Sequence, residues 1–110
     1  MVAMRMEVTA HGFTMSDALH DTVLQEIARL AQGLRRPIGL IEVDLYDEHA
    51  AARRGCDKRC CVRIQFEDTT SVERDDAESD FQSSVAEAFA RVLREPRPLV
   101  TSSRVKKVVR

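Results

Sequence analysis

The sequence predicts an α+β fold, a two-layer sandwich in which a four-stranded sheet carries both helices on one face. Hydrophobic residues recur with the period of a strand or of a helix in the order β-α-β-β-β-α. Each strand has only one apolar face, so we expect both helices to cover that face and leave the other to solvent. The first helix joins two strands as a right-handed parallel crossover, and the short links after it are typical of an antiparallel meander.

The strands are predicted from side chains that alternate between apolar and polar. A fourth strand, over residues 70–76, depends on Val72 because four charged residues follow from Glu73 to Asp76. The apolar faces of the first three strands are formed by Met4, Met6 and Val8, by Ile41, Val43 and Leu45, and by Cys60, Val62, Ile64 and Phe66.

The first helix is predicted to begin after Gly12, where Thr14 or Ser16 can serve as the N-cap. Gly33 suits its end, and Pro37 prevents its continuation. Its apolar stripe is formed by Leu19, Val23, Ile27, Leu30 and Leu34.

The second helix is predicted to begin at an S-x-x-Q capping box formed by Ser79 and Gln82. Pro96 and Pro98 end it. Its apolar stripe is formed by Phe81, Val85, Ala88, Phe89 and Val92.

Length and composition predict one globular domain over residues 1–98 and a basic tail over residues 99–110. Hydrophobic residues make up 44% and charged residues 32%, as in soluble globular proteins. No apolar stretch approaches the roughly 18 residues of a membrane span, and the N-terminus lacks the apolar run of a signal peptide. Three cysteines, two of them adjacent, favour a reducing compartment. We therefore expect a cytoplasmic protein that contacts no membrane.

The charged residues are segregated along the chain, although the formal net charge is only −1. Residues 53–63 carry five basic side chains against one acid, and residues 91–110 carry seven against one. Between them, residues 67–80 carry seven acids against Arg74. The neutral total therefore conceals two basic segments that could meet an acidic partner.

Two passages and the element order carry a resemblance to a known family. The start VTAHGFTMSDALHDTV and the passage DAESDFQSSVAEAF into the second helix resemble the ribosome hibernation promoting factor family. This family includes ribosome-associated inhibitor A and is also called the sigma-54 modulation protein family. The resemblance covers residues 4–95, and LYDEH followed by DKRC is similar to a short bacterial subgroup with a D-K-R-C motif.

The resemblance implies a stress or stationary-phase factor that binds the small ribosomal subunit in the channel used by messenger and transfer RNA. Inhibition of translation would come from steric occupancy, so the implied protein is not an enzyme and needs no cofactor or small-molecule substrate. Long family members add a C-terminal dimerisation domain, which 110 residues are too few to contain.

The basic residues are the candidates for contact with ribosomal RNA, because clustered Lys and Arg neutralise phosphates and release their counterions. The alternative interpretation is that each cluster is ordinary solvated surface charge. The candidates are Arg29, Arg35, Arg36, Arg53, Arg54, Lys58, Arg59, Arg91, Arg94, Arg104, Lys106 and Lys107.

The cysteines, with His49, formally provide enough ligands for tetrahedral zinc. Neighbouring strand residues point to opposite faces, however, so Cys60 and Cys61 cannot both reach one ion. We expect no metal site, with Cys60 in the core and Cys61 on the open face. Cys56, in a basic loop, is a candidate reactive thiol.

Two other functions remain as alternatives. An enzyme would use His11, His20 or His49 with a nearby acid, but the sequence contains no nucleophile elbow, phosphate loop or metalloprotease helix. A regulatory module of the same fold would bind a protein, or form a weak homodimer, without binding ribosomes. Its surface would be the open sheet face around Tyr46, formed by Arg5, Glu7, Glu42, Asp44, Arg63 and Gln65.

Overall fold

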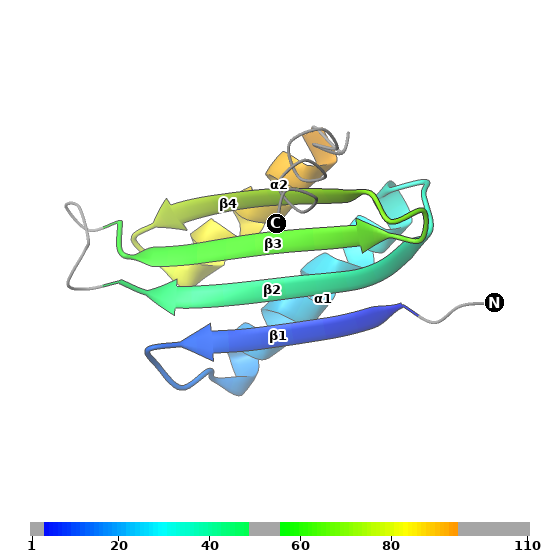
Figure 1. The fold of residues 1–110 in the computed structure, drawn as a ribbon. Coiled ribbons are helices and arrows are strands. Elements are labelled where there is room, and N and C mark those ends of the chain that lie inside the picture. Colours follow the sequence, from blue (N-terminus) through cyan, green and yellow to red (C-terminus); the bar gives the residue numbers. More distant parts are fainter. Residues whose placement is uncertain (1–3, 49–55, 95–110) are drawn as a thin grey trace, which may run out of the picture.

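The computed structural model describes residues 4–48 and 56–94 and confirms the predicted α+β class and element order. The four strands form one sheet in the order β1-β2-β3-β4, and both helices lie on the same face of it (Figure 1). In the described part of the chain, neither helix has the length and hydrophobicity that a membrane span requires. The elements are β1 (Arg5–His11), α1 (Asp17–Gly33), β2 (Ile38–Asp47), β3 (Lys58–Phe66), β4 (Ser71–Glu78) and α2 (Phe81–Arg94).

The strand pairing follows the predicted topology. β1 is parallel to β2, with Val8 opposite Val43, and α1 connects these two strands. β2, β3 and β4 are successively antiparallel, with Val43 opposite Val62. The parallel crossover unit and the antiparallel meander are therefore both confirmed.

β2 and β4 both extend beyond the residues from which they were predicted. β2 begins at Ile38, where a register irregularity between Ile38 and Leu40 interrupts the alternation while Ile38 stays buried. β4 continues to Glu78 despite its run of charged residues. It can do so because Asp76, on the helix side of the strand, has an ionic partner in α2, Arg91, at 3.0 Å.

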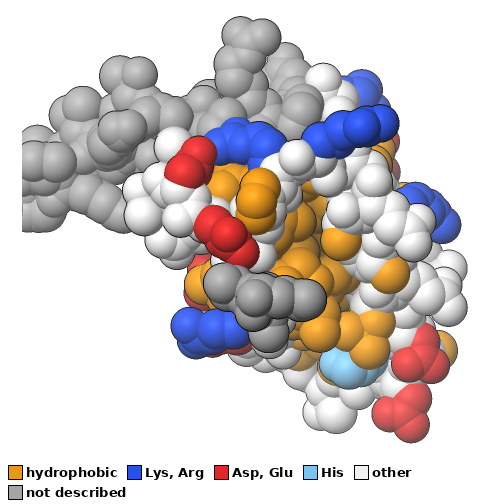
Figure 2. Space-filling view, turned by 90° about the vertical axis from the view of Figure 1, so that its right-hand side faces the viewer, with side chains coloured by type: hydrophobic (Ala, Val, Ile, Leu, Met, Phe, Trp, Pro, Cys, Tyr) orange, Lys and Arg blue, Asp and Glu red, His pale blue; other side chains and the backbone are white. Residues whose placement is uncertain are grey.

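β1 is an edge strand, and its apolar face is only partly covered. Met4 and Val8 are partly buried, but Met6 is 48% exposed, so the prediction of a buried face is wrong at Met6. The cause is its position, because α2 lies over β3 and β4 while α1 mainly contacts α2 and β2. Figure 2 faces the end of the molecule where β1 begins and shows hydrophobic side chains gathered there.

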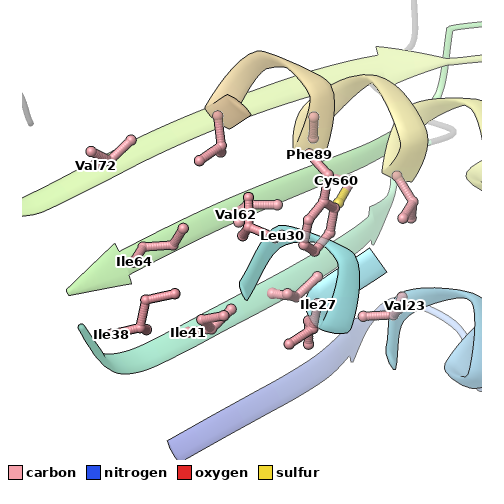
Figure 3. Close-up of a cluster of buried hydrophobic side chains, with 14 of the residues drawn as sticks. Val23, Ile27, Leu30, Ile38, Ile41, Cys60, Val62, Ile64, Val72 and Phe89 are labelled. Atoms are coloured by element: carbon pink, nitrogen blue, oxygen red, sulfur yellow. The ribbon is translucent and has the colours of Figure 1, made fainter. Parts of the chain in front are cut away.

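The hydrophobic core lies between the sheet and the two helices. Figure 3 shows Phe89 reaching from α2 toward β3, beside Cys60 and Leu30. All three side chains are almost fully buried. The predicted stripes of both helices are buried except at Phe81, which is partly buried and stacks on Phe13 with ring centroids 4.6 Å apart. Each large apolar side chain buried in this way contributes about 1.5–3 kcal/mol relative to an exposed one.

The two helix N-termini are capped differently. At α1 the Ser16 hydroxyl oxygen accepts a hydrogen bond from the Leu19 amide at 3.1 Å, which confirms one of the two predicted caps. At α2 the capping carboxylate belongs to Asp80, whose Oδ1 accepts from the Ser83 amide at 2.7 Å. The prediction of a Ser79 capping box is therefore wrong by one residue. Asp80 also accepts from the Ser83 hydroxyl at 3.1 Å, and Asp is as good an N-cap as Ser.

Replacing Asp80 with Ala is expected to lower the free energy of unfolding by about 1 kcal/mol, because one amide of the first turn loses its acceptor. Replacing Ser79 with Ala is the matched control and should change stability by less than about 0.5 kcal/mol. Urea denaturation of both variants, followed by far-ultraviolet circular dichroism, makes the comparison. A larger loss at Ser79 than at Asp80 would contradict the assigned cap.

Candidate nucleic-acid interface

Positive charge is distributed unevenly between the described residues and the rest of the chain. The described residues carry ten Lys and Arg against seventeen Asp and Glu, a formal charge of −7 with histidine neutral. The remaining residues carry seven basic side chains against Glu95, a charge of +6, which together with −7 gives the −1 of the whole chain. The described part of the chain is therefore acidic, and the basic excess of the sequence lies in residues 49–55 and 95–110.

Lys58 and Arg59 of the D-K-R-C segment form ion pairs where β2 ends and β3 begins. We call this group of ion pairs, with Asp47, Glu48 and Asp57, the ionic clamp. Lys58 Nζ lies 3.3 Å from Asp47 and 3.0 Å from Asp57, and the Asp57 hydrogen bond is the main cause of its raised pKa. The Glu48 amide donates to the Asp57 carbonyl oxygen at 2.8 Å, and Arg59 lies 3.3 Å from the Glu48 carboxylate. The clamp therefore holds the two ends of the β2–β3 connection together, and Lys58 and Arg59 are both neutralised by it.

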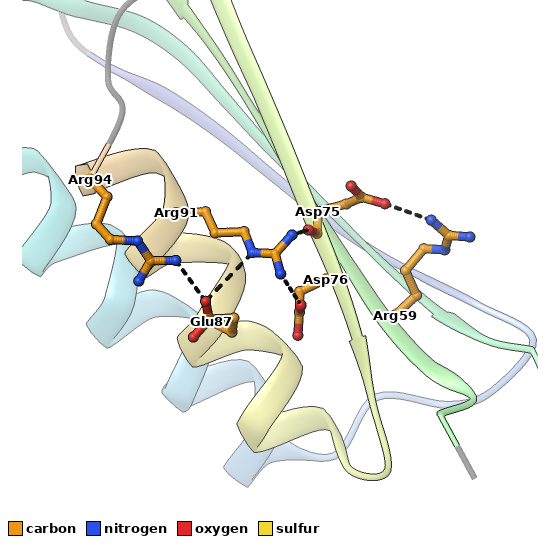
Figure 4. A network of polar contacts seen from close by, with 6 residues as sticks. All are labelled: Arg59, Asp75, Asp76, Glu87, Arg91 and Arg94. Carbon is orange, nitrogen blue, oxygen red and sulfur yellow. Dashed lines mark hydrogen bonds and ion pairs between the residues drawn. The ribbon is translucent and has the colours of Figure 1, made fainter. Parts of the chain in front are cut away.

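A second ionic network connects β3, β4 and α2. Arg59 pairs with Asp75 at 2.6 Å, and Arg91 donates to the backbone oxygen of Asp75 at 3.1 Å (Figure 4). Arg91 also pairs with Asp76 at 3.0 Å and with Glu87 at 3.5 Å. Glu87 in turn accepts from Arg94 at 2.7 Å. The arginines of α2 are thus bound to carboxylates of the protein itself.

Asp76 is the buried member of this network. Its Oδ1 faces Arg91, whereas its Oδ2 has no hydrogen-bond partner within the described ranges. Burial first, and then the neighbouring Glu78 carboxylate, raise the pKa of Asp76 from 3.8 to about 6, although Arg91 opposes the shift. A proton on Asp76 would give Oδ2 a hydrogen to donate to Glu78, so this carboxyl is expected to titrate in mildly acidic solution.

The raised pKa of Asp76 predicts that its contribution to native stability falls as pH rises from about 4 to about 6, because the folded state binds this proton more tightly than the unfolded state. Asp76→Asn cannot titrate, so it should be more stable than the native chain above pH 6, by about 1–3 kcal/mol, and should lose this part of the pH dependence. Urea midpoints measured between pH 4 and pH 8 test this. Asp75→Asn, on the opposite face of β4, is the control and should keep the slope. A destabilised Asp76→Asn variant with an unchanged slope would refute the prediction.

The arginines around the C-terminal end of α1 differ in their surroundings. Arg36 pairs with Asp68 at 2.8 Å and lies 4.0 Å above the ring of Phe66. Hydrogen bonds from Thr70, and then from Arg36, lower the pKa of Asp68 to about 2. Arg35 is exposed and forms no ion pair with any residue of the described ranges. Arg36 is therefore engaged within the fold, whereas Arg35 is available to a partner.

The predicted RNA-contacting residues thus fall into three groups. Arg35 is the one described candidate that is exposed without an ion pair inside residues 4–48 and 56–94. Arg29 pairs with Glu26 at 3.2 Å. The other candidates that pair with carboxylates of the same chain are Arg36, Lys58, Arg59, Arg91 and Arg94. The candidates that lie outside the described residues are Arg53, Arg54, Arg104, Lys106 and Lys107.

The open sheet face contains an aromatic pair that the sequence patterns did not reveal. His11 Nε2 lies 2.8 Å from Asp44, and the His11 ring stacks on Tyr46 with centroids 4.4 Å apart and an interplanar angle of 11°. The parallel register places His11 beside Tyr46, so knowledge of that register would have predicted the contact. Burial, and then Asp44, raise the pKa of Tyr46. Tyr46 is therefore packed within the sheet face and does not stand alone among charges.

The thiols follow the predicted strand geometry. Cys60 is fully buried in the core, and burial raises its thiol pKa. Cys61 lies on the other face, where its Sγ is 3.3 Å from Glu73, and burial followed by Glu73 raises its pKa to about 12. Cys56 is exposed. The described residues contain no group of three metal-ligating side chains, and His49 lies outside them.

The sequence and the fold are similar to those of known proteins. The family model described as Sigma 54 modulation protein / S30EA ribosomal protein matches residues 6–96. The structure is similar to the N-terminal domain of Protein Y from Thermus thermophilus, with a TM-score of 0.64 and 17% identity, covering 86% of this chain and 94% of that one. It is also similar to a ribosomal subunit interface protein from Coxiella burnetii, with a TM-score of 0.61 and 11% identity, covering 93% and 99%. A search of curated protein sequences gave no match. Because the family model spans most of the sequence, the chain belongs to the Sigma 54 modulation protein / S30EA ribosomal protein family.

Proposed function

We propose that the chain is a ribosome-associated inhibitor of translation that binds the small ribosomal subunit under stress. The observation that carries the proposal is the family match over residues 6–96. A structural neighbour that covers 93% of the chain is a ribosomal subunit interface protein, which supports the same site of action. Inhibition would follow from occupancy of the channel for messenger and transfer RNA, a mechanism that needs no catalysis, and it would take place in the cytoplasm.

The charge distribution supports a specific mode of RNA contact. A body with a formal charge of −7 is repelled by phosphate, so the attraction must come from residues that are basic and not already neutralised. Among the described candidates Arg35 is such a residue, and the sequence carries its basic excess in residues 49–55 and 95–110, which include the tail, residues 99–110, that follows the proposed 1–98 domain. We propose these as the primary contacts with ribosomal RNA.

The engaged arginines would have a secondary role. Arg29, Arg36 and Arg94, like Lys58, Arg59 and Arg91, each hold a carboxylate of the same chain. To contact a phosphate, each would have to exchange that carboxylate, which removes most of the net gain. Their expected contribution to affinity is therefore small.

Sucrose-gradient sedimentation of lysates from stationary-phase cells tests the proposal. At native abundance and low salt, the chain should migrate with ribosomal particles and should be released by high salt, because phosphate contacts are screened. A chain that stays wholly at the top of the gradient at low salt would favour the alternative, a protein-binding module of the same fold. The formal charge of −7 on the described residues is the observation that favours this alternative.

A further inference from the structure

We propose that the outer edge of β1 is a self-association site, at which two copies of this chain pair their β1 strands antiparallel about a two-fold axis at Met6. The pairing joins two four-stranded sheets into one continuous sheet. It requires no ribosome, so it stands or fails independently of the proposed function.

The two edges of the sheet differ in how well they are protected against pairing with a second strand. β4 carries consecutive charged residues from Glu73 to Asp76, and Arg91 donates to the backbone oxygen of Asp75 at 3.1 Å. Charged side chains and a covering group of this kind prevent a second strand from pairing with an edge. β1 is a regular seven-residue strand that, among the described elements, pairs only with β2, and this pairing has no register irregularity. The β1 edge is therefore the one suited to strand addition.

An exposed apolar side chain, Met6, lies near the N-terminal end of this edge. Met6 is 48% exposed and is flanked on the same face by Met4 and Val8, which are only partly buried. Met6 and Leu93 are the exposed large hydrophobic residues of the described chain. Burying Met6 against a second copy removes apolar surface from water and stabilises association.

The charges on the opposite face select the register. In an antiparallel pair centred on Met6, Arg5 of each copy lies opposite Glu7 of the other, and Met4 lies opposite Val8. This gives two cross-strand pairs of opposite charge, an arrangement that stabilises paired strands. Within one copy Arg5 and Glu7 are only loosely paired, at 3.6 Å, with side chains 72% and 52% exposed. Both are therefore available to a second copy.

A neighbouring register lacks this complementarity. Centring the pair on Val8 places Arg5 opposite His11 and Glu7 opposite Thr9, so no opposite charges meet and Met6 faces Ala10. The Met6-centred register is therefore preferred. Its short span and small apolar area predict a weak dimer, with a dissociation constant on the order of 0.1 mM.

Sedimentation velocity of the purified full chain, between about 10 µM and about 1 mM, tests the proposal around that dissociation constant. The sedimentation coefficient should rise with concentration. Met6→Lys should remove the rise, since Met6 is at the centre of the proposed paired segment and a charge there opposes pairing. Leu93→Lys, at the other exposed hydrophobic residue, is the matched control and should leave the rise unchanged.

A mixing experiment identifies the register. Arg5→Glu leaves Glu at both positions, and Glu7→Arg leaves Arg at both, so each variant alone should repel its own copies and remain monomeric. An equimolar mixture places Glu opposite Arg at both contacts and should form a heterodimer with roughly the native affinity. Neither variant retains an Arg5–Glu7 pair within one copy, so restored association can arise only between copies.

Three results would overturn the proposal. The native chain could stay monomeric to about 1 mM, where a dimer of the expected affinity is mostly formed. Met6→Lys could dimerise as well as the native chain, or the mixture could remain monomeric while the native chain dimerises. The native chain could also be monomeric while Met6→Lys, but not Leu93→Lys, no longer sediments with ribosomes. In that case the β1 edge contacts the ribosome instead of a second copy.

Discussion

Replacing Arg53, Arg54, Arg104, Lys106 and Lys107 together with Gln is expected to lower the affinity of the chain for the small ribosomal subunit by about 10³-fold near 0.1 M salt. These residues belong to the segments that hold the basic excess of the sequence. Each lost contact between a basic side chain and a phosphate also reduces the slope of log affinity against log salt by about 0.7–0.9. Filter binding to purified subunits at several salt concentrations measures both quantities.

A second five-residue variant controls for net charge. Five described arginines pair closely with carboxylates of the same chain in the structure: Arg29, Arg36, Arg59, Arg63 and Arg94. Replacing these with Gln changes the formal charge by the same amount, so long-range repulsion from RNA increases equally. The control should retain the native affinity to within about tenfold, because paired surface arginines contribute little. An equal loss in both variants would show that the engaged arginines contact RNA.

Phe89→Ala is expected to lower the free energy of unfolding by about 3–5 kcal/mol, the largest effect of any single substitution considered for this fold. The Phe89 side chain is 1% exposed and fills the space between α2 and β3, so its removal leaves a cavity as well as losing buried apolar area. Domains of this size have a total stability of about 5–15 kcal/mol, so the variant should lose a large fraction of its stability.

Urea denaturation followed by far-ultraviolet circular dichroism measures this loss, since the chain contains no tryptophan to report on unfolding. Leu93→Ala, one turn further along α2, is the matched control. Leu93 is 36% exposed, so its truncation should cost about 1 kcal/mol or less. Comparable losses for the two variants would contradict the assignment of Phe89 to the centre of the core.

Much of the fold could be predicted from the sequence because burial imposes a period on each element. The five apolar residues predicted for α1 are all buried, and the alternation in β3 from Cys60 to Phe66 agrees with the structure. The errors occur where neighbours decide the outcome. Met6 has the correct period but no helix above it, and Asp80 displaced Ser79 because two adjacent residues could both cap α2.

The candidate site was less predictable, because a sequence shows which residues are charged but not which charges meet. Arg59 and Asp75 are far apart in sequence and form an ion pair of 2.6 Å only because β3 and β4 are neighbours. Likewise, His11 contacts Asp44 across the parallel pair of β1 and β2. Pairing of this kind is determined by strand register, so the neutralised arginines could be separated from the available ones only in three dimensions.

The proposal that the chain occupies the channel for messenger and transfer RNA is tested by binding of the purified chain to small ribosomal subunits, with and without prebound messenger and transfer RNA. We expect the chain to bind empty subunits at low salt, to bind them more weakly as salt rises, and to be excluded from subunits whose channel is already occupied. Equal binding to empty and occupied subunits, or no binding to either at low salt, would contradict it.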